Sequence, residues 1–320
     1  MLRQIEITPL HWAGFIVIVL VLLSLDLGVF HRRAHVIRFK EALAWTTIWF
    51  VLSLGFCGAL IQLRSREEAL EFFTGYIIEL SLSMDNVFVM AVIFAYFRVP
   101  LEYQHRVLFW GILGALVMRG VMIGAGAAAI NRFDWLLYLL GVFLIFTGAK
   151  VIFLGDRPPD PEKNVVLRAA RRLFPVTTEF QGQKFFAVLD GRAALTPLAL
   201  VLLMVETTDL VFAVDSIPAI FAVTKKPFIV FTSNVCAILG LRSLYFVLAG
   251  AIGYFRYLRV GLSLVLCFIG TKMLLGAWDI DLPITTSLAV VASIILTSIV
   301  FSIIVARQSV KNAGADVRRL

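Results

Sequence analysis

Two short acid-bearing segments offer the clearest chemistry in this sequence, because carboxylates inside apolar stretches can bind a cation or a proton. The segments, residues 84–88 and 208–212, read Met-Asp-Asn-Val-Phe and Thr-Asp-Leu-Val-Phe. An Arg follows the Asp after 34 residues in the first case and 33 in the second, and a Lys follows that Arg after 31 and 30 residues. The matched residues are Asp85, Arg119 and Lys150 and, in the second set, Asp209, Arg242 and Lys272. Their common order and spacing indicate an internal repeat.

Six acidic residues lie inside long apolar stretches, where an ionisable side chain is by default a candidate for function. An Asp at the centre of a membrane helix costs about 2.5–3.5 kcal/mol on insertion scales, so we expect each acid to have a partner. Four basic residues in the same stretches leave two negative charges, which one divalent cation would balance. Protonation of the acids is the alternative. The acids are Asp26, Glu79, Asp85, Glu206, Asp209 and Asp215.

Oxygen-bearing side chains surround these acids and indicate the kind of cation. Carboxylate, hydroxyl and amide oxygens suit hard ions such as Mn²⁺, Mg²⁺ or Ca²⁺, whereas Zn²⁺ and Cu⁺ usually recruit His or Cys. The predicted metal ligands are Glu79, Asp85, Asn86, Glu206, Asp209 and Asp215. The predicted supporting residues are Asp26, Ser83, Thr208, Ser216, Asn234, Arg119, Arg242, Lys150 and Lys272. We expect the cation to be cargo, with no resident cofactor.

The four bases inside the apolar stretches each have two interpretations. Arg119 and Arg242 are expected to pair with acids across a helical bundle, since an unpaired charge at that depth is costly. Contact with an anionic substrate is the alternative. Lys150 and Lys272 either extend to the nearer membrane interface or compete with the metal for the acids.

Composition and hydropathy predict the elements that must position these residues. Apolar residues make up 60% of the 320 residues and the mean hydropathy is +0.93, values typical of a membrane protein with several spans. Windows of about 20 apolar residues predict nine transmembrane helices in a single all-α domain over residues 1–306. The windows lie near 11–30, 42–62, 69–97, 105–130, 134–154, 197–223, 228–252, 257–278 and 284–306.

The positive charges predict the orientation of the chain in the bilayer. Of the 29 Lys and Arg residues, 19 fall in one set of alternate loops and 6 in the other. The richer set belongs on the cytoplasmic side, so we expect the N-terminus outside and a C-terminal tail, residues 307–320, in the cytoplasm. This distribution explains the net charge of +8 without nucleic acid as a partner.

That orientation defines the geometry of the repeat. The third and sixth spans cross in opposite directions, so residues 69–154 and 197–278 are predicted to be inverted-topology repeats of three helices each. In such an architecture the substrate binds near the midplane, between the halves. Lys150 would then lie near the cytoplasmic face and Lys272 near the outer face. Pro218 lacks an N–H and is expected to interrupt the sixth span beside the last of the acids, with a simple packing kink as the alternative.

Two segments outside the spans carry local signals. Residues 155–196 are predicted to be a cytoplasmic linker with a short basic helix and a small hairpin, in which Asp190 and Gly191 fit a type I′ turn. Thr196 then fits the cap of the sixth span. The segment has no phosphate-binding Gly-rich loop, so ATP drive is not supported. Residues 65–68 fit a capping box, with an ion-collecting acidic vestibule as the alternative.

Three motifs resemble the TerC family of integral membrane proteins, in particular its Alx-like branch. They are residues 79–86, 206–219 and 233–246, and the resemblance extends from about Asp26 to Arg307. It implies Mn²⁺ export or Mn²⁺ homeostasis in a bacterial inner membrane, with an association with tellurium resistance. The family is grouped with LysE-type exporters, which have inverted repeats, and its acidic motif residues correspond to the six acids named above.

The residues and the resemblance together predict a transporter and not an enzyme. We expect a divalent cation to bind at carboxylates of the third and sixth spans and to be carried outward as the two repeats rock, with proton exchange as a candidate drive. Mg²⁺ and Ca²⁺ suit oxygen ligands equally well, so the preference for Mn²⁺ rests on the resemblance.

Two alternatives to transport remain open at this point. One is a membrane scaffold that metalates or assists exported proteins, which would form a stable complex and show little flux of its own. The other is a di-aspartyl intramembrane hydrolase, although the sequence lacks the Gly-x-Gly-Asp motif of such enzymes.

Overall fold

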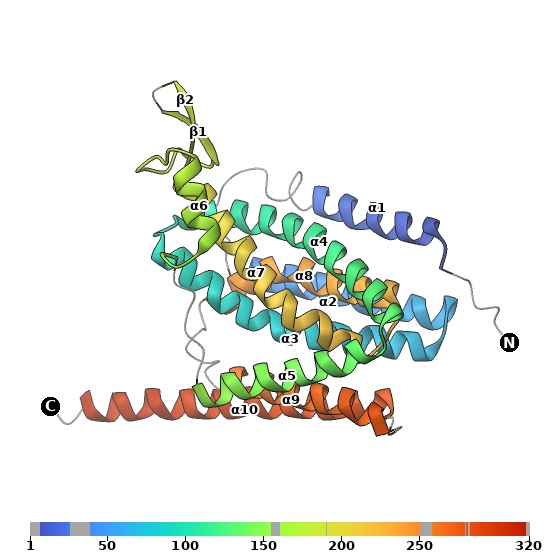
Figure 1. Cartoon of the computed structure of the whole chain (residues 1–320). Coiled ribbons are helices and arrows are strands. Elements are labelled where there is room, and N and C mark those ends of the chain that lie inside the picture. The colour runs from blue at the N-terminus through green and yellow to red at the C-terminus, as the bar shows by residue number, and fades with distance from the viewer. Residues whose placement is uncertain are drawn as a thin grey trace.

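The structure, a computed structural model, is almost wholly helical (Figure 1). It describes residues 7–25, 39–154, 161–189, 191–249, 258–278, 280 and 282–317. Eight of the described helices are long and apolar enough to cross a membrane. They are α2 (Phe39–Leu63), α3 (Arg66–Tyr96), α4 (Leu101–Arg132), α5 (Trp135–Leu154), α7 (Pro197–Phe221), α8 (Pro227–Ala249), α9 (Leu258–Leu275) and α10 (Ile284–Val317). The predicted all-α membrane fold is confirmed.

The two ends of the predicted domain differ from the prediction. A helix, α1 (Pro9–Leu25), stands where the first span was expected, near 11–30. It is apolar but only 17 residues long, and residues 26–30 lie outside the described part of the chain. At the other end α10 continues to Val317, so most of the expected tail extends the last helix.

Capping side chains explain where two of the spans begin. Ser65 Oγ accepts a hydrogen bond from the backbone N–H of Glu68 at 3.1 Å, at the start of α3. Thr196 Oγ1 accepts one from the N–H of Ala199 at 3.3 Å, at the start of α7. Both bonds satisfy N–H groups that have no partner inside the helix. The predicted caps at Ser65 and Thr196 are therefore confirmed.

Pro218 does not interrupt α7, and the prediction of a broken sixth span is wrong. The helix is continuous from Pro197 to Phe221. Pro218 stands in the last turn, where its missing N–H affects only the carbonyl of Val214 and the rest of the helix keeps its hydrogen bonds. Asp215 is therefore held by a regular helix.

The predicted hairpin is present between α5 and α7, next to a short helix. Helix α6 (Val165–Leu173) is followed by the antiparallel strands β1 (Phe186–Leu189) and β2 (Arg192–Leu195). Leu189 pairs with Arg192 at the predicted turn. Gly191 has a φ of +75°, as a type I′ turn requires, while Asp190 lies outside the described residues.

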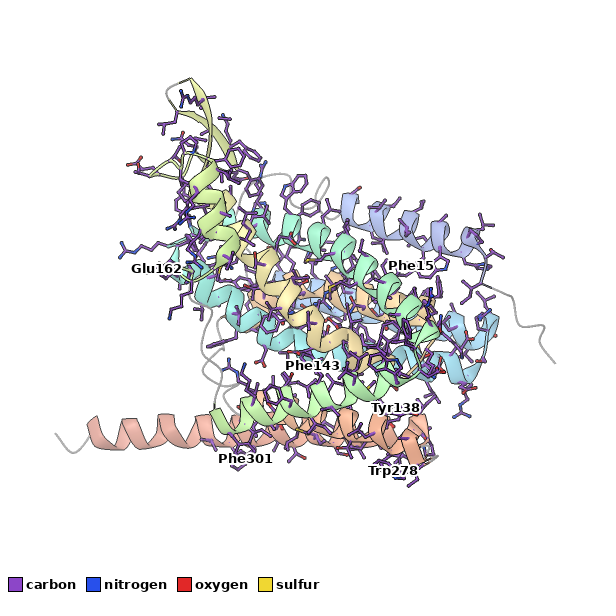
Figure 2. All side chains as sticks on the ribbon, in the orientation of Figure 1. Phe15, Tyr138, Phe143, Glu162, Trp278 and Phe301 are labelled. Atoms are coloured by element: carbon purple, nitrogen blue, oxygen red, sulfur yellow. The ribbon has the colours of Figure 1, made fainter. Side chains whose placement is uncertain are left out.

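The long helices form two groups (Figure 1). The first, which we call the bundle, contains α2, α3, α4, α7 and α8, with α3 packed against α8 and α4 against α7. The second contains α5 packed along α9, and α10 against α9. Side chains fill the spaces between these helices (Figure 2). Exposed Tyr138 on α5 and Trp278 in the short helix η3 (Gly276–Trp278) lie near the same end of the molecule, as expected for aromatic side chains at a membrane interface.

Small residues let α5 and α9 approach closely. A Cβ on Gly148 would lie 2.6 Å from the carbonyl oxygen of Ser263, and one on Gly270 would lie 2.5 Å from that of Gly141. The contacts run in opposite order along the two helices, which are therefore antiparallel. Gly141 and Gly148 precede Lys150 by nine and two residues, the same distances at which Ser263 and Gly270 precede the matching Lys. Each contact therefore joins two positions that do not correspond in the two predicted repeats, as a two-fold axis between the repeats would require. The inverted repeat itself stays a prediction.

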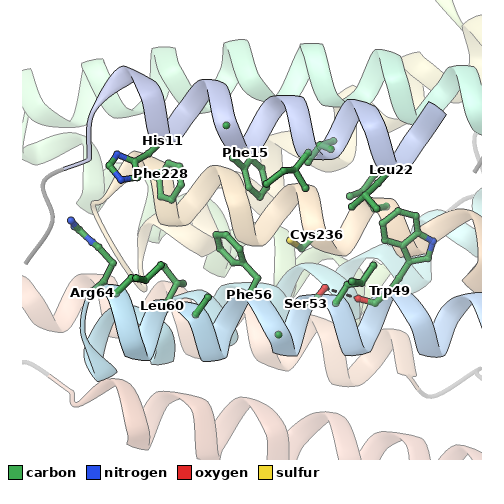
Figure 3. Close-up of a pocket in the computed structure, with 18 of the residues that line it drawn as sticks. His11, Phe15, Leu22, Trp49, Ser53, Phe56, Leu60, Arg64, Phe228 and Cys236 are labelled. Atoms are coloured by element: carbon green, nitrogen blue, oxygen red, sulfur yellow. Dashed lines mark hydrogen bonds between the residues drawn. The ribbon is translucent and has the colours of Figure 1, made fainter. Parts of the chain in front are cut away.

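A large groove of about 790 Å³ lies between α1, α2 and α8. Figure 3 shows Phe15 of α1 near Phe56 of α2, with Cys236 of α8 beside them. Arg64 and His11 lie at one end, and nearly all of the remaining lining is apolar. The described lining residues include no carboxylate, and their apolar side chains suit contact with lipid.

Candidate functional site

A buried arginine lies at the centre of the predicted site. Arg119 of α4 is 1% exposed. Its Nε and Nη2 donate to the two carboxylate oxygens of Asp209 on α7, at 3.1 and 3.0 Å. Its Nη1 donates to Oε1 of Glu79 on α3 and, at 3.2 Å, to Oγ of Ser216 on α7. Three helices therefore meet at this charge cluster, and one acid from each predicted repeat shares the same base.

Two oxygen atoms of this cluster remain available. Bidentate pairing of Arg119 with Asp209 is a strong charge-assisted contact, and Asn86 Nδ2 adds a 3.4 Å hydrogen bond to Asp209 Oδ1. Glu79 Oε2 and Asn86 Oδ1, however, are buried and have no hydrogen-bond donor among the described residues. A buried acceptor without a donor calls for a ligand, and a cation or a water molecule would supply one.

A cavity of about 190 Å³ opens beside the cluster. At roughly 30 Å³ per water in the liquid, this volume holds a cation together with part of its water shell. Helices α3, α4 and α7 of the bundle form one wall, and α5 and α9 form the other. The polar and charged lining residues are Glu79, Asp85, Asn86, Arg119, Thr147, Lys150, Asp215, Ser216 and Ser263. Four of the six predicted ligands, and two of the four predicted bases, therefore share one cavity.

The acids around the cavity differ in their surroundings. Glu79 and Asp209 are buried and bound to Arg119. Asp85 is about a quarter exposed, and its Oδ1 lies 3.5 Å from Nε of Arg259 at the start of α9. The guanidinium of Arg259 also stacks over the ring of Phe88, 5.0 Å from its centroid. Glu79 and Asp209 are thus fixed in the interior, whereas Asp85 is partly exposed.

Glu206 is not a lining residue of the cavity, and its role as a ligand beside Asp209 stays a prediction. Its carboxylate lies directly against the α-carbon of Gly114 on α4, in space that any larger residue at position 114 would fill. The reason is the neighbouring helix: Gly114 leaves room for the side chain on the α4 side of α7.

Most of the predicted supporting residues also lie away from the cavity lining. Ser83 and Asn234 are fully buried, and their side-chain polar atoms have no hydrogen-bond partner among the described residues. Thr208 Oγ1 donates to the carbonyl of Met204 at 2.7 Å. Arg242 is buried on α8, and Lys272 is half-buried in the last turn of α9.

Asp26, the remaining predicted residue, lies outside the described part of the chain.

The carboxylates do not form a closed metal shell in this structure. Among the described residues, no three Asp, Glu, His or Cys side chains lie close enough together to hold one metal ion. Arg119 lies between Glu79 and Asp209 and pairs with both of them. A cation in the cavity would meet scattered oxygens and a fixed positive charge.

Two polar residues that line the cavity, Thr147 and Ser263, and one beside it, Arg259, were not predicted. Thr147 lies one helical turn before Lys150, so its place on the same face of α5 could have been derived from that spacing. Ser263 and Arg259 are on α9, and their part in the site depends on how α9 packs beside α5 and α3. No spacing in the sequence marks that packing.

The acidic cluster at the start of α3 is neutralised by bases. Arg64 Nε lies 2.8 Å from Glu68 Oε2, and Lys226 Nζ lies 3.1 Å from Glu71 Oε2. Burial lowers the pKa of Lys226, but its hydrogen bond to Glu71 and the charges of both acids outweigh that effect, so the pKa is raised. The paired acids, together with the cap at Ser65, favour a structural role over an ion-collecting vestibule.

Comparison with known proteins gives one family and a set of bacterial relatives. The integral membrane protein TerC family matches residues 64–311. An "Uncharacterized membrane protein" of Myxococcus xanthus is 53% identical over 302 residues, which cover 94% of each chain. A "Putative membrane-bound redox modulator Alx" of Escherichia coli K12 is 45% identical over 311 residues, 92% of this chain and 94% of the relative. A Rickettsia bellii membrane protein is 40% identical over 295 residues, 92% and 97% of the two chains. No solved structure matches.

Proposed function

The chain belongs to the TerC family of integral membrane proteins, and we propose that it transports a hard divalent cation through the cavity beside Arg119. The expected cargo is Mn²⁺ and the expected direction is export from the cytoplasm of a bacterial cell through its inner membrane. The metal identity comes from the family resemblance, and the choice of a hard cation comes from the oxygen ligands.

One observation carries the proposal: buried, unpaired oxygens from α3 face a cavity whose walls also hold carboxylates of α3 and α7. Glu79 Oε2 and Asn86 Oδ1 have no donor among the described residues. Asp85 and Asp215 line the same cavity. A lipid-facing or purely structural pocket gains nothing from such groups, because each costs free energy to bury.

Arg119 makes the site suitable for passage and not for storage. Its guanidinium stays charged at every physiological pH and holds Glu79 and Asp209 in place. It also offsets part of their negative charge, which weakens the attraction for a divalent ion. Conduction requires a site that binds strongly enough for entry and weakly enough for release. A site with an incomplete set of ligands and a fixed positive charge meets that requirement.

The packing of the helices favours a motion different from the rocking of whole repeats that we predicted. The bundle forms one wall of the cavity, and α5 with α9 forms the other. Backbone-to-backbone contacts at Gly148 and Gly270 join α5 to α9, which are the third helices of the two predicted repeats. We propose that α5 and α9 move together against the bundle, which opens the cavity to alternate sides of the membrane.

Lys150 has a defined place in this scheme. It lies on the α5 wall and faces the cavity that Asp85 and Asp215 line from the other side. Its charge has the same sign as the cargo, so Lys150 and the cation would compete for the same carboxylates. We propose that Lys150 occupies the acids when the cargo has left. Proton exchange at Asp85 and Asp215 remains the proposed drive.

The names of several relatives contain the word redox, and the cysteines bear on that point. Cys57, Cys236 and Cys267 are free thiols on three different helices, and the sequence has no Cys-x-x-Cys motif. Cys57 and Cys267 contact backbone carbonyls of Ala69 and Ile145. We therefore propose that any redox effect is indirect, through the metal that is moved.

A di-aspartyl hydrolase is not favoured. Asp85 lies near Arg259 and Asp209 is bound by Arg119, so the two motif aspartates belong to different ion pairs. A catalytic dyad needs two carboxylates that share a proton.

Flux through purified protein tests the proposed function. The protein is placed in liposomes that enclose a Mn²⁺-sensitive dye, and uptake is followed with and without a pH gradient. We expect Asp85→Asn and Asp215→Asn each to lower the initial rate at least tenfold, because both remove a cavity carboxylate while keeping its shape. The control is Glu102→Gln, an exposed acid at the start of α4. Unchanged flux in both variants would refute the assignment, and a stable complex with an exported protein without flux would favour the scaffold.

A further inference from the structure

Helix α6 and the hairpin β1–β2 form an arm, residues 165–195, that extends sideways from one end of the bundle. In Figure 1 the long helices run roughly parallel, whereas α6 runs across them and the hairpin continues away from the bundle. Since the long helices cross the bilayer, an element at their ends that runs across them lies along the membrane surface. Its position follows from the fold and does not depend on the proposed transport.

Helix α6 has a basic face and an uncovered apolar face. Val166 and Leu173 are seven residues apart, two helical turns, and are 43% and 75% exposed. Arg168, Arg171 and Arg172 are exposed on the other side of the helix. Leu167 is buried and attaches α6 to the bundle. A helix with arginines on one side and bare aliphatic side chains on the other is typical of a helix that lies in the membrane interface.

The hairpin also combines exposed apolar side chains with exposed basic ones. Phe186 and Val188 are 68% and 77% exposed, and their spacing of two places them on the same face of β1. Lys184 and Arg192 are exposed nearby. Figure 2 shows side chains standing out from the whole length of the arm, with none of the cover that the bundle helices give one another.

The arm is held firmly, so these apolar side chains are not exposed because of a loose structure. Arg106 of α4 donates to Gln183 Oε1 at 3.4 Å, and its guanidinium lies 5.5 Å from the ring centroid of Phe185. Thr196 Oγ1, at the start of α7, donates to the carbonyl of Lys184 at 2.7 Å. The root of the hairpin is thereby fixed to two membrane-spanning helices.

We propose that the arm binds the surface of the same membrane and recognises anionic phospholipids. Residues 165–195 contain five Lys and Arg residues against two acids. The arginines of α6 contact lipid phosphates, and Leu173 and Val188 enter the boundary between head groups and acyl chains. Lipid is the occupant that the geometry favours, because the bilayer around α4 and α7 continues directly beneath the arm.

Spin labels measure the depth of the arm directly. Leu173→Cys and Val188→Cys are labelled with a nitroxide in the full-length protein and placed in vesicles of phosphatidylcholine, with or without phosphatidylglycerol. The collision rates with oxygen, which concentrates in lipid, and with a water-soluble nickel chelate are compared. Glu162→Cys, at an exposed polar position before α6, is the matched control, and the unsubstituted chain reports labelling of native cysteines.

The expected result is a clear difference in depth. In vesicles with phosphatidylglycerol, the ratio of oxygen to nickel collisions at positions 173 and 188 should exceed that of the control at least threefold. The combined variant Arg168→Gln, Arg171→Gln and Arg172→Gln should reduce the ratio toward the control. Labels at both positions that are as open to nickel as the control would overturn the proposal. Labels shielded from both reagents would also overturn it, because they would indicate a protein partner.

Discussion

At the scale of residues, Arg119 supplies the counter-charge for two buried acids. It is shared by Glu79 and Asp209, and its planar fork can contact both carboxylates at once. A buried charge left without its partner is among the costliest defects in a protein. Arg119 therefore stabilises the fold and, at the same time, sets the charge that a cation would meet in the cavity.

Removal of Arg119 should destabilise the protein strongly. Arg119→Gln leaves Glu79 and Asp209 buried without a counter-charge, and breaking a buried pair in this way costs about 3–5 kcal/mol. Arg119→Lys should be intermediate, because an ammonium group cannot contact both acids with fork geometry. Thermal unfolding of the purified protein in detergent measures the effect. Arg132→Gln, exposed at the end of the same helix, should change little. A melting temperature for Arg119→Gln equal to that of Arg132→Gln would contradict the pairing.

Single residues were predictable to the extent that hydropathy marks them. Asp85, Asp209 and Arg119 stand out because a charge in an apolar stretch is rare, and the structure places all three in or beside one cluster. Glu206 shares a helical face with Asp209 by spacing, yet its carboxylate lies against Gly114. Where a side chain finds space depends on which residues of the neighbouring helix are small, and no pattern within one helix contains that information.

At the scale of elements, the contact between α5 and α9 brings two helix backbones close together in one wall of the cavity. Gly141 and Gly148 on α5 meet Gly270 and Ser263 on α9, and a methyl group at these glycines would meet backbone atoms. Lipid is as apolar as the helices, so close packing and not burial holds such a pair together. In the proposed motion, these glycines would hold the two helices of the cavity wall together.

A methyl group at this contact should separate the two helices. In Gly148→Ala the new Cβ would lie 2.6 Å from the carbonyl oxygen of Ser263, and overpacking of this kind costs about 1–3 kcal/mol. Gly124→Ala on α4 is the matched control, since nothing lies within 4 Å of its Cβ position. That control should be neutral or more stable, because Gly weakens a helix relative to Ala. Equal unfolding midpoints for the two variants would show that α5 and α9 are not in close contact.

The positions of the helices along the chain were predicted from the sequence far better than the packing of one helix against another. Apart from the end of α10, runs of apolar residues located the spans to within a few residues, and the caps at Ser65 and Thr196 were visible as local motifs. The pairing of α5 with α9 was not predictable, because a membrane helix that is apolar on all sides carries no marked face. Pro218 misled the prediction since a proline in the last turn breaks little.

At the scale of the whole molecule, the cavity lies between two bodies. The bundle carries Glu79, Asp85, Arg119 and Asp215, whereas Lys150 stands on the opposite wall. Motion of α5 and α9 against the bundle would separate Lys150 from the acids and expose them in turn to each side. Rocking of one predicted repeat against the other would instead shear the close contact between α5 and α9. The first motion therefore requires α5 and α9 to stay in contact, whereas the second requires them to slide past each other.

Transport after cross-linking tests this central claim most directly. One variant joins the cavity walls, with Thr147→Cys on α5 and Phe212→Cys on α7 in a Cys267→Ser background and a short thiol-specific linker. The other joins α5 to α9, with Ile145→Cys beside native Cys267, whose Sγ lies 3.8 Å from the carbonyl oxygen of residue 145. We predict that the first cross-link stops Mn²⁺ flux until it is reduced, while the second leaves at least half of the flux. Loss of flux with the second cross-link, or undiminished flux with the first, would contradict the account.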